Sequence, residues 1–271
     1  MGYSERLRKL FAGIKIHAED LLLLEAFQVG YLPDRVPKKE FAALLRKYPF
    51  VQRFLITKDP SIEEYISTVL IENKPIDDIK LVNQYCDDLL WEIAELIVYN
   101  KYPEVYDRKV KFRWNKEEIV EKESINGKTI ADVGAGSGML SFLLARYAKL
   151  VYAIEPLSSF RGFIRNKALK EKVNNIYTID GFLDLIPLPD NSIDVLFTSN
   201  AIGWNLDEEL KEIDRVVKPN GQAIHLMRSI GNKSENPFHD TLISAKWNYR
   251  FYKYTDKEGP RIKYVKVNSI P

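Results

Sequence analysis

The sequence predicts an α/β protein: a doubly wound, mostly parallel sheet of seven strands with an antiparallel C-terminal hairpin, preceded by an all-α N-terminal domain. Three observations carry this prediction. Residues 1 to about 103 carry apolar side chains at the helical spacings of three and four, without the alternation of a strand. From residue 128, short β-branched runs alternate with helical stretches, which is typical of a parallel sheet covered on both faces. The last two strand-like runs have only a turn between them.

The N-terminal helices are expected at residues 21–24, 41–48, 61–71 and 77–99. Ser61 and Glu64 have the spacing of a capping box, and Asp59-Pro60 ends the helix before it. We place the domain boundary in the segment that follows, giving a helical domain at 1–112 and an α/β domain at 113–271. The helical domain is expected to act as a lid or substrate-binding domain, or to form a homodimer surface.

The α/β domain begins with one more capped helix, with Asn115 at the cap and Glu118 three residues later. Its strands are expected at 129–133, 150–154, 176–179, 193–198 and 223–227, and those of the hairpin at 247–255 and 262–267.

Composition limits the function. The 271 residues suffice for one large or two modest domains, and the 45% apolar fraction is that of a folded globular protein. A net charge of +2 is too small to indicate a nucleic-acid partner by itself. The single cysteine, Cys86, excludes an internal disulfide and a thiolate zinc site, so we expect no metal. Apolar runs fall short of the roughly 18 residues that a membrane helix needs, so we expect no membrane partner and a cytoplasmic location.

Residues 132–138, Asp-Val-Gly-Ala-Gly-Ser-Gly, join the first strand to a helix. Such a loop lets a ligand approach the backbone beside the positive end of the helix. No lysine follows Gly138, which excludes a nucleoside triphosphate loop. The third glycine follows the second by two residues and not three, so a dinucleotide such as NAD is only the alternative ligand.

This spacing, with Asp132 two residues before Gly134, resembles motif I of the class I S-adenosylmethionine-dependent methyltransferases. The similarity continues in order and spacing over residues 115–228. It includes Glu155 at the end of the second strand and Asp180-Gly181 at the end of the third. The segments 187–195 and 210–221 are similar to the fourth strand and to the helix and turn before the fifth strand of the methyltransferase type 11 group, which includes quinone-biosynthesis methyltransferases.

The resemblance implies S-adenosyl-L-methionine as cofactor. It implies that Glu155 receives the two ribose hydroxyls, since a carboxylate can accept from two O–H donors, and that Asp180 lies beside the adenine. Asn200, at the end of the fourth strand, is expected as a pocket wall. The expected cofactor-binding residues are Asp132, Gly134, Ala135, Gly136, Gly138, Glu155, Asp180, Gly181 and Asn200.

The sequence identifies no catalytic residue. His225 lies within a strand and reads as a core residue, His17 reads as structural, and His239 lies close to where a substrate would enter. The segment 198–204 lacks the two prolines found where DNA-base amines are methylated, which argues against that chemistry. Arg113, just before the first strand, is a candidate for holding the cofactor's carboxylate, or it packs on Trp114.

The C-terminal hairpin is basic: residues 246–266 hold seven basic side chains against Asp256 and Glu258, with tyrosines interleaved. This pattern is typical of an edge protected by lysines, which we favour, and also of single-stranded nucleic-acid binding. The sequence therefore predicts a methyltransferase that acts on a small-molecule acceptor. The alternatives are an RNA methyltransferase that uses the hairpin and a non-catalytic S-adenosylmethionine-binding protein.

Overall fold

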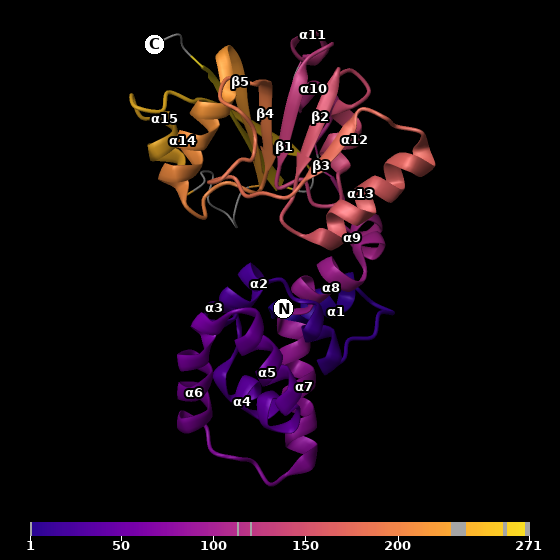
Figure 1. The fold of residues 1–271 in the computed structure, drawn as a ribbon, viewed down its shortest axis with the longest axis vertical. Helices are drawn as coiled ribbons and strands as arrows, with labels where there is room; N and C mark the ends of the chain where they lie inside the picture. The colour runs from indigo at the N-terminus through magenta and orange to yellow at the C-terminus, as the bar shows by residue number, and fades with distance from the viewer. Residues whose placement is uncertain (1, 113, 120, 229–236, 257–258, 269–271) are drawn as a thin grey trace. The chain divides into compact units, whose positions relative to one another are not determined.

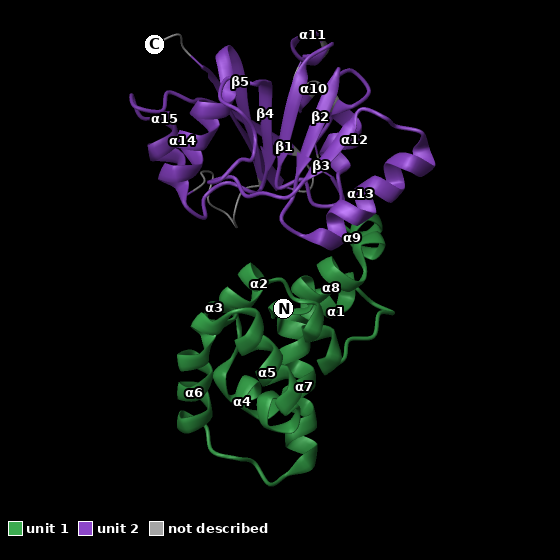
Figure 2. Ribbon diagram, in the orientation of Figure 1, with its two compact units in different colours: residues 1–110 green, residues 111–271 purple. Residues whose placement is uncertain are grey.

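A computed structural model describes residues 2–112, 114–119, 121–228, 237–256 and 259–268. The chain divides into two compact units, Met1–Val110 and Lys111–Pro271 (Figure 2). The division falls two residues before the boundary expected from the sequence. None of the helices in the described segments is long and apolar enough to cross a membrane.

The N-terminal unit is helical. Its elements are α1 (Tyr3–Leu10), η1 (Ala18–Leu23), α2 (Ala26–Gly30), α3 (Leu32–Arg35), α4 (Lys38–Lys47), α5 (Pro49–Lys58), η2 (Pro60–Ile62), α6 (Glu63–Glu72), α7 (Ile79–Glu92), α8 (Ala94–Lys101) and α9 (Pro103–Lys109) (Figure 1). The apolar faces of η1, α4, α5, α6 and α7 meet in one core, which includes Leu21, Leu44, Leu55 and Leu89.

Two local expectations for this unit were wrong. The predicted helix over 77–99 is two helices, α7 and α8, because the backbone leaves helical geometry at Ile93, which is nevertheless buried and so keeps the apolar pattern unbroken. Ser61 does not cap α6. Its backbone N–H and its hydroxyl both donate to Asp59 Oδ1, at 3.0 and 2.7 Å, because Pro60 starts a 3₁₀ turn before the helix.

The C-terminal unit has the predicted α/β fold. Its helices are α10 (Lys116–Ile119), α11 (Lys122–Ile125), α12 (Met139–Leu144), α13 (Ser158–Glu171), α14 (Leu206–Val216) and α15 (His239–Ile243). Its strands are β1 (Thr129–Val133), β2 (Leu150–Ile154), β3 (Ile176–Ile179), β4 (Ile193–Ser199), β5 (Val217–Arg228), β6 (Arg250–Asp256) and β7 (Gly259–Val267). The sheet order is β3-β2-β1-β4-β5-β7-β6, parallel from β3 to β5, while β7 is antiparallel to both of its neighbours. The doubly wound sheet and its terminal hairpin confirm the predicted fold class.

Helices cover both faces of the sheet, and β1 shows this because successive residues of a strand point to opposite sides. In β1, Ile130 packs with residues of α10, α11 and α12, whereas Ala131 and Val133 pack with residues of α14 and α15. Asp132 therefore points to the α12 side. The order reverses at β1, with β2 on one side and β4 on the other. In such sheets the crevice at the carboxyl ends of these strands is the usual ligand position.

Candidate ligand site at the carboxyl edge

The register of the parallel strands brings the residues predicted for the site to one edge of the sheet. Val133 pairs with Ile154 and with Thr198, and Ile154 pairs with Ile179. The residues that directly follow these positions, Gly134, Glu155, Asp180 and Ser199, thus lie at one level. We call this the carboxyl edge.

The glycine loop has three residues in the left-handed region. Gly134, Gly136 and Gly138 have φ values of 72°, 55° and 82°. A Cβ on Gly134 would lie 2.4 Å from Ala201 Cβ, and one on Gly138 would lie 2.9 Å from Ile164 Cγ1, so close packing requires both glycines. A Cβ on Gly136 would meet nothing within 4 Å. Gly136 therefore faces open space, as a loop that receives a ligand must.

Glu155 is bound to this loop. Its carboxylate accepts from the backbone N–H of Gly136 at 2.7 Å and from that of Leu157 at 3.0 Å, and the residue is 5% exposed. Burial raises the pKa of Glu155 to about 7, although the two N–H donors and nearby Arg161 favour the charged form. The acid predicted to hold a ribose thus points toward the glycine loop and gains or loses its proton near neutral pH.

Two buried polar atoms beside the loop have no partner among the described residues. Asp132 Oδ2 accepts from the Ser141 hydroxyl at 2.6 Å, but Asp132 Oδ1 has no hydrogen bond, and neither does the Ser137 hydroxyl. Burial raises the pKa of Asp132 to about 6, while the contacts with Ser141 oppose that shift. Unpaired buried polar atoms are costly, so this pair suggests a polar ligand that completes their bonding.

Arg161 connects the ends of β2 and β3 and was missed by the sequence reasoning. Its guanidinium donates to the carbonyls of Glu155 and Pro156, both at 2.7 Å, and forms an ion pair with Asp180 at 3.0 Å. A basic residue in the first turn of α13 runs against the helix dipole. That local conflict is the signal that could have revealed Arg161.

Glu209 was also missed. This buried carboxylate at the start of α14 accepts from the N–H groups of Gly203, Trp204 and Asn205, at 2.6, 2.9 and 3.1 Å. It fixes the loop that follows β4. Asn200 begins this loop in the left-handed region, with φ 56°, and its side chain is exposed at the carboxyl edge, where a pocket wall was expected.

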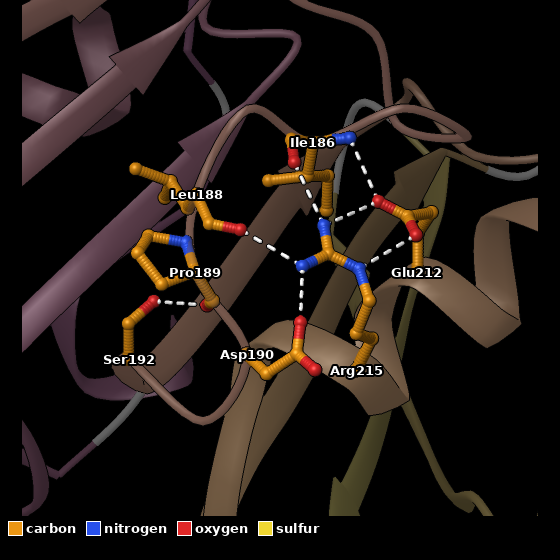
Figure 3. A network of polar contacts seen from close by, with 7 residues as sticks. All are labelled: Ile186, Leu188, Pro189, Asp190, Ser192, Glu212 and Arg215. Carbon is orange, nitrogen blue, oxygen red and sulfur yellow. Dashed lines mark hydrogen bonds and ion pairs between the residues drawn. The ribbon is translucent and has the colours of Figure 1, made fainter.

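The loop between β3 and β4 is held in a similar way (Figure 3). Arg215 of α14 donates to the carbonyls of Ile186 and Leu188 at 2.8 and 2.9 Å, and it pairs with Asp190 and Glu212. The Glu212 carboxylate also accepts from the N–H of Ile186. The hydrogen bonds from Arg215 lower the pKa of Glu212, although partial burial acts against this. Both loops that follow the carboxyl edge are therefore anchored to α14.

Neither histidine of this unit is arranged as an unengaged base. His225 is fully buried between the hydroxyls of Thr198, at 2.8 Å from Nδ1, and Tyr249, at 3.0 Å from Nε2. Burial lowers its pKa to about 3, with Lys266 adding to the effect, so the ring is neutral. This confirms the reading of His225 as a core residue. His239 lies 3.0 Å from the Tyr264 hydroxyl.

The basic C-terminal hairpin ends the sheet, and β6 is its edge strand. Several of its cations are engaged within the protein. Arg261 pairs with Glu118 at 2.7 Å, Lys266 pairs with Asp214, and Lys263 donates to the Glu118 carbonyl at 2.7 Å. All three lie on β7, the strand next to the edge strand, so these contacts engage the positive charge of β7 within the protein.

Three residues of the sequence hypotheses, Arg113, Lys257 and Glu258, lie outside the described residues. Trp114, which follows Arg113, is buried, and the Arg261 guanidinium lies 5.4 Å from the centre of its ring.

Residues 131–225 match a family model described as a methyltransferase domain. Over 142 residues the chain is 32% identical to a Dictyostelium discoideum protein named as a methyltransferase, covering 49% of this chain and 51% of that protein. Over 111 residues it is 34% identical to an uncharacterized methyltransferase of Schizosaccharomyces pombe, covering 40% and 41%. The chain thus spans about half the length, or less, of these relatives. A SAM dependent methyltransferase from Aquifex aeolicus superposes with a TM-score of 0.46 at 19% identity, over 63% of this chain and 92% of that one.

The low pKa of His225 predicts how stability depends on pH. In the unfolded chain His225 takes up a proton below about pH 6.5, whereas in the folded protein it stays neutral down to about pH 3. The free energy of unfolding therefore falls as the pH is lowered through that range. His225→Gln loses the buried hydrogen bonds and should be less stable at pH 7. Its deficit relative to the parent should shrink by up to about 1.4 kcal/mol per pH unit between pH 6 and 4.

Urea unfolding at several pH values measures this difference. A deficit of His225→Gln that is constant with pH would contradict a neutral buried imidazole.

Substitution of Glu209 should lower the stability of the folded protein substantially. Glu209→Gln keeps one oxygen acceptor for three backbone N–H groups, so we expect a loss of about 1–3 kcal/mol. Glu208→Gln on the same helix removes an exposed ion pair with Lys211, which water screens, and should cost much less stability than Glu209→Gln. Thermal unfolding of the two variants tests the difference. Equal losses would show that Glu209 does not anchor the loop.

Proposed function

We propose that this chain is a class I methyltransferase that transfers a methyl group from S-adenosylmethionine to a small-molecule acceptor. The match of residues 131–225 to the methyltransferase family model supports this. The observation that carries the proposal is the convergence of an open glycine loop and a buried acid at one sheet edge. Glu155 and Gly136 are directly hydrogen-bonded there.

The residues present fit S-adenosylmethionine. The open space at Gly136 admits a ligand close to the backbone, and the unpaired atoms Asp132 Oδ1 and Ser137 Oγ provide buried polar partners for it. Charged Glu155 has lone pairs beyond the two that its backbone donors use, which suits two ribose hydroxyls. NAD remains the alternative ligand for this crevice.

We assign the remaining positions by their place at the carboxyl edge. Asp180 and Gly181 follow β3 and would lie beside the adenine, with Arg161 holding the Asp180 carboxylate in place. Ala135 and Asn200 would form walls of the pocket. Gly134 and Gly138 would act indirectly, because their close packing fixes the shape of the loop.

When bound, S-adenosylmethionine supplies an electrophilic methyl group on a positively charged sulfur. The chain's own contribution is then mainly placement, which can be worth effective molarities of about 10⁵ to 10⁸ M. The anchored loops after β3 and β4 suit this role, because Glu209 and Arg215 hold them rigidly before any acceptor arrives.

The two anchored loops, where we place the acceptor, expose apolar side chains. Leu185 and Trp204 are 72% and 64% exposed, one on each anchored loop, and the Asn205 side chain donates to Asp184 at 3.2 Å, which links the two loops. A small acceptor with an apolar body would bury these side chains. We propose that the helical unit supplies a lid or a dimer surface.

Gly136→Ala should weaken S-adenosylmethionine binding by at least about tenfold, because the new methyl group would occupy the open space at the loop. Isothermal titration calorimetry measures the affinity. The matched control is Gly127→Ala: Gly127 has φ 69° and also has nothing within 4 Å of an added Cβ, but it lies before β1. Both variants should lose about 1 kcal/mol of stability to backbone strain, and only Gly136→Ala should lose affinity.

The parent protein should be stabilised against heat by S-adenosylmethionine and not by NAD. Stabilisation by NAD alone would overturn the assignment of S-adenosylmethionine as cofactor.

Transfer of a labelled methyl group from S-adenosylmethionine to apolar small molecules would support the proposed acceptor class. Transfer to RNA that falls steeply with salt would favour the hairpin instead. Binding with no transfer to any acceptor would favour a non-catalytic protein.

Cofactor affinity should depend on the protonation of Glu155. A raised pKa of about 7 means that the acid is largely protonated at pH 6, and it must be charged to accept from two hydroxyls. Affinity should therefore rise with pH up to about 7 and then level off, and binding at pH 6 should release a proton. Titration calorimetry in buffers of different ionisation enthalpy counts that proton. Glu155→Gln should bind more weakly at pH 8 and lose most of the pH dependence, and an unchanged affinity would refute the ribose assignment.

A further inference from the structure

The N-terminal unit contains a cleft of about 540 Å³ that the methyl-transfer proposal does not use. It lies between α4, the C-terminal end of α6, the linker 73–78 and the start of α7. Its volume is within the range of about 300–1,000 Å³ that is typical of small-molecule sites.

The walls of the cleft are fixed by contacts within the unit. The Arg46 guanidinium, from α4, donates to the carbonyls of Leu70 and Asn73, both at 2.6 Å, and so ties down the start of the linker. Lys47, also from α4, donates to the Asn83 side chain on α7. The cleft is therefore formed before any ligand enters, which limits the entropic cost of binding.

Part of the lining is apolar and open to water. Ala43, Ile76, Ile79 and Val82 line the cleft, and Ile79 is 63% exposed. A ligand with an apolar body would remove this surface from water, at a gain of roughly 25 cal/mol per Å² of apolar surface.

The charged part of the lining is strongly one-sided. Lys39, Arg46, Lys47 and Lys74 all line the cleft, and within the described residues none of the four is paired with an acid. The lining carboxylate, Glu72, is paired with Lys38 outside the lining, at 3.2 Å. The N-terminal unit as a whole has 16 basic and 18 acidic side chains, so this concentration of positive charge is local. A concave site with charge of one sign attracts a ligand of the opposite charge.

We propose that this cleft binds a small amphiphilic anion, in which a carboxylate or phosphate head meets the four cations and an apolar body covers Ile76, Ile79 and Val82. The concave shape and the modest volume favour a free small molecule over a membrane surface. The site lies wholly within the N-terminal unit, so the proposal does not depend on methyl transfer by the other unit.

The experiment titrates the full chain with decyl phosphate below its micelle concentration, in low salt, and measures binding by calorimetry. One molecule per chain should bind, and added salt should weaken it. Decyltrimethylammonium, with the same chain and the opposite charge, and inorganic phosphate, with the head alone, should each bind at least about tenfold more weakly. Equal binding of either one would overturn the proposal, and so would no binding of decyl phosphate.

Two matched pairs of exposed substitutions locate the site. Lys74→Glu should weaken decyl phosphate binding by at least about tenfold, whereas Lys15→Glu, outside the cleft, should leave it unchanged. Ile79→Gln should weaken it by about fivefold, whereas Ile71→Gln, at a residue that is 82% exposed on α6 but not part of the lining, should not. Equal effects within both pairs would show that decyl phosphate binds elsewhere. S-adenosylmethionine affinity, measured in parallel, should be unchanged in all four variants.

Discussion

The hydrogen bond from the Gly136 N–H to the Glu155 carboxylate is the contact on which the ligand site depends. It joins the glycine loop after β1 to the end of the neighbouring strand β2. The two meet because the parallel register puts Val133 beside Ile154. A buried acid that is held by backbone N–H groups and not by a lysine or arginine side chain keeps acceptor capacity for a ligand. Its raised pKa is the cost of that arrangement. Fold and chemistry are thus coupled at one pair of residues.

Much of this edge could be predicted from the sequence, because the demands on it are local. Gly134, Gly136 and Gly138 each adopt positive φ, which narrows the choice of residue, and strand ends follow from the alternation of apolar runs and helices. Asn220 likewise has the expected positive φ, although it lies within β5 and not in a turn before it, where the pairing of β5 with β4 is irregular between Val217 and Gln222. These predictions needed no knowledge of which side chains meet.

The residues that the sequence did not reveal act at longer range or through the backbone. Arg161 and Arg215 each donate to two backbone carbonyls, and every residue has a carbonyl, so no residue type marks these partners. Glu209 has three N–H donors in a loop whose path is not encoded in any periodicity. The misplaced cap at Ser61 has the same origin, because the motif was present but Asp59 and Pro60 offered the backbone a competing turn.

The two units also differ in how they could form a binding site. At the carboxyl edge the topology itself creates the crevice, so position in the fold already indicates a ligand. A helical bundle has no such preferred place, and the cleft in the N-terminal unit arises only because the linker 73–78 crosses beside α4 and α7 while Arg46 holds its start. Its cations come from two segments more than twenty-five residues apart in sequence, Lys39 to Lys47 and Lys74, so they form no charge run. Tertiary structure alone assembles them, in a unit whose overall charge is slightly negative.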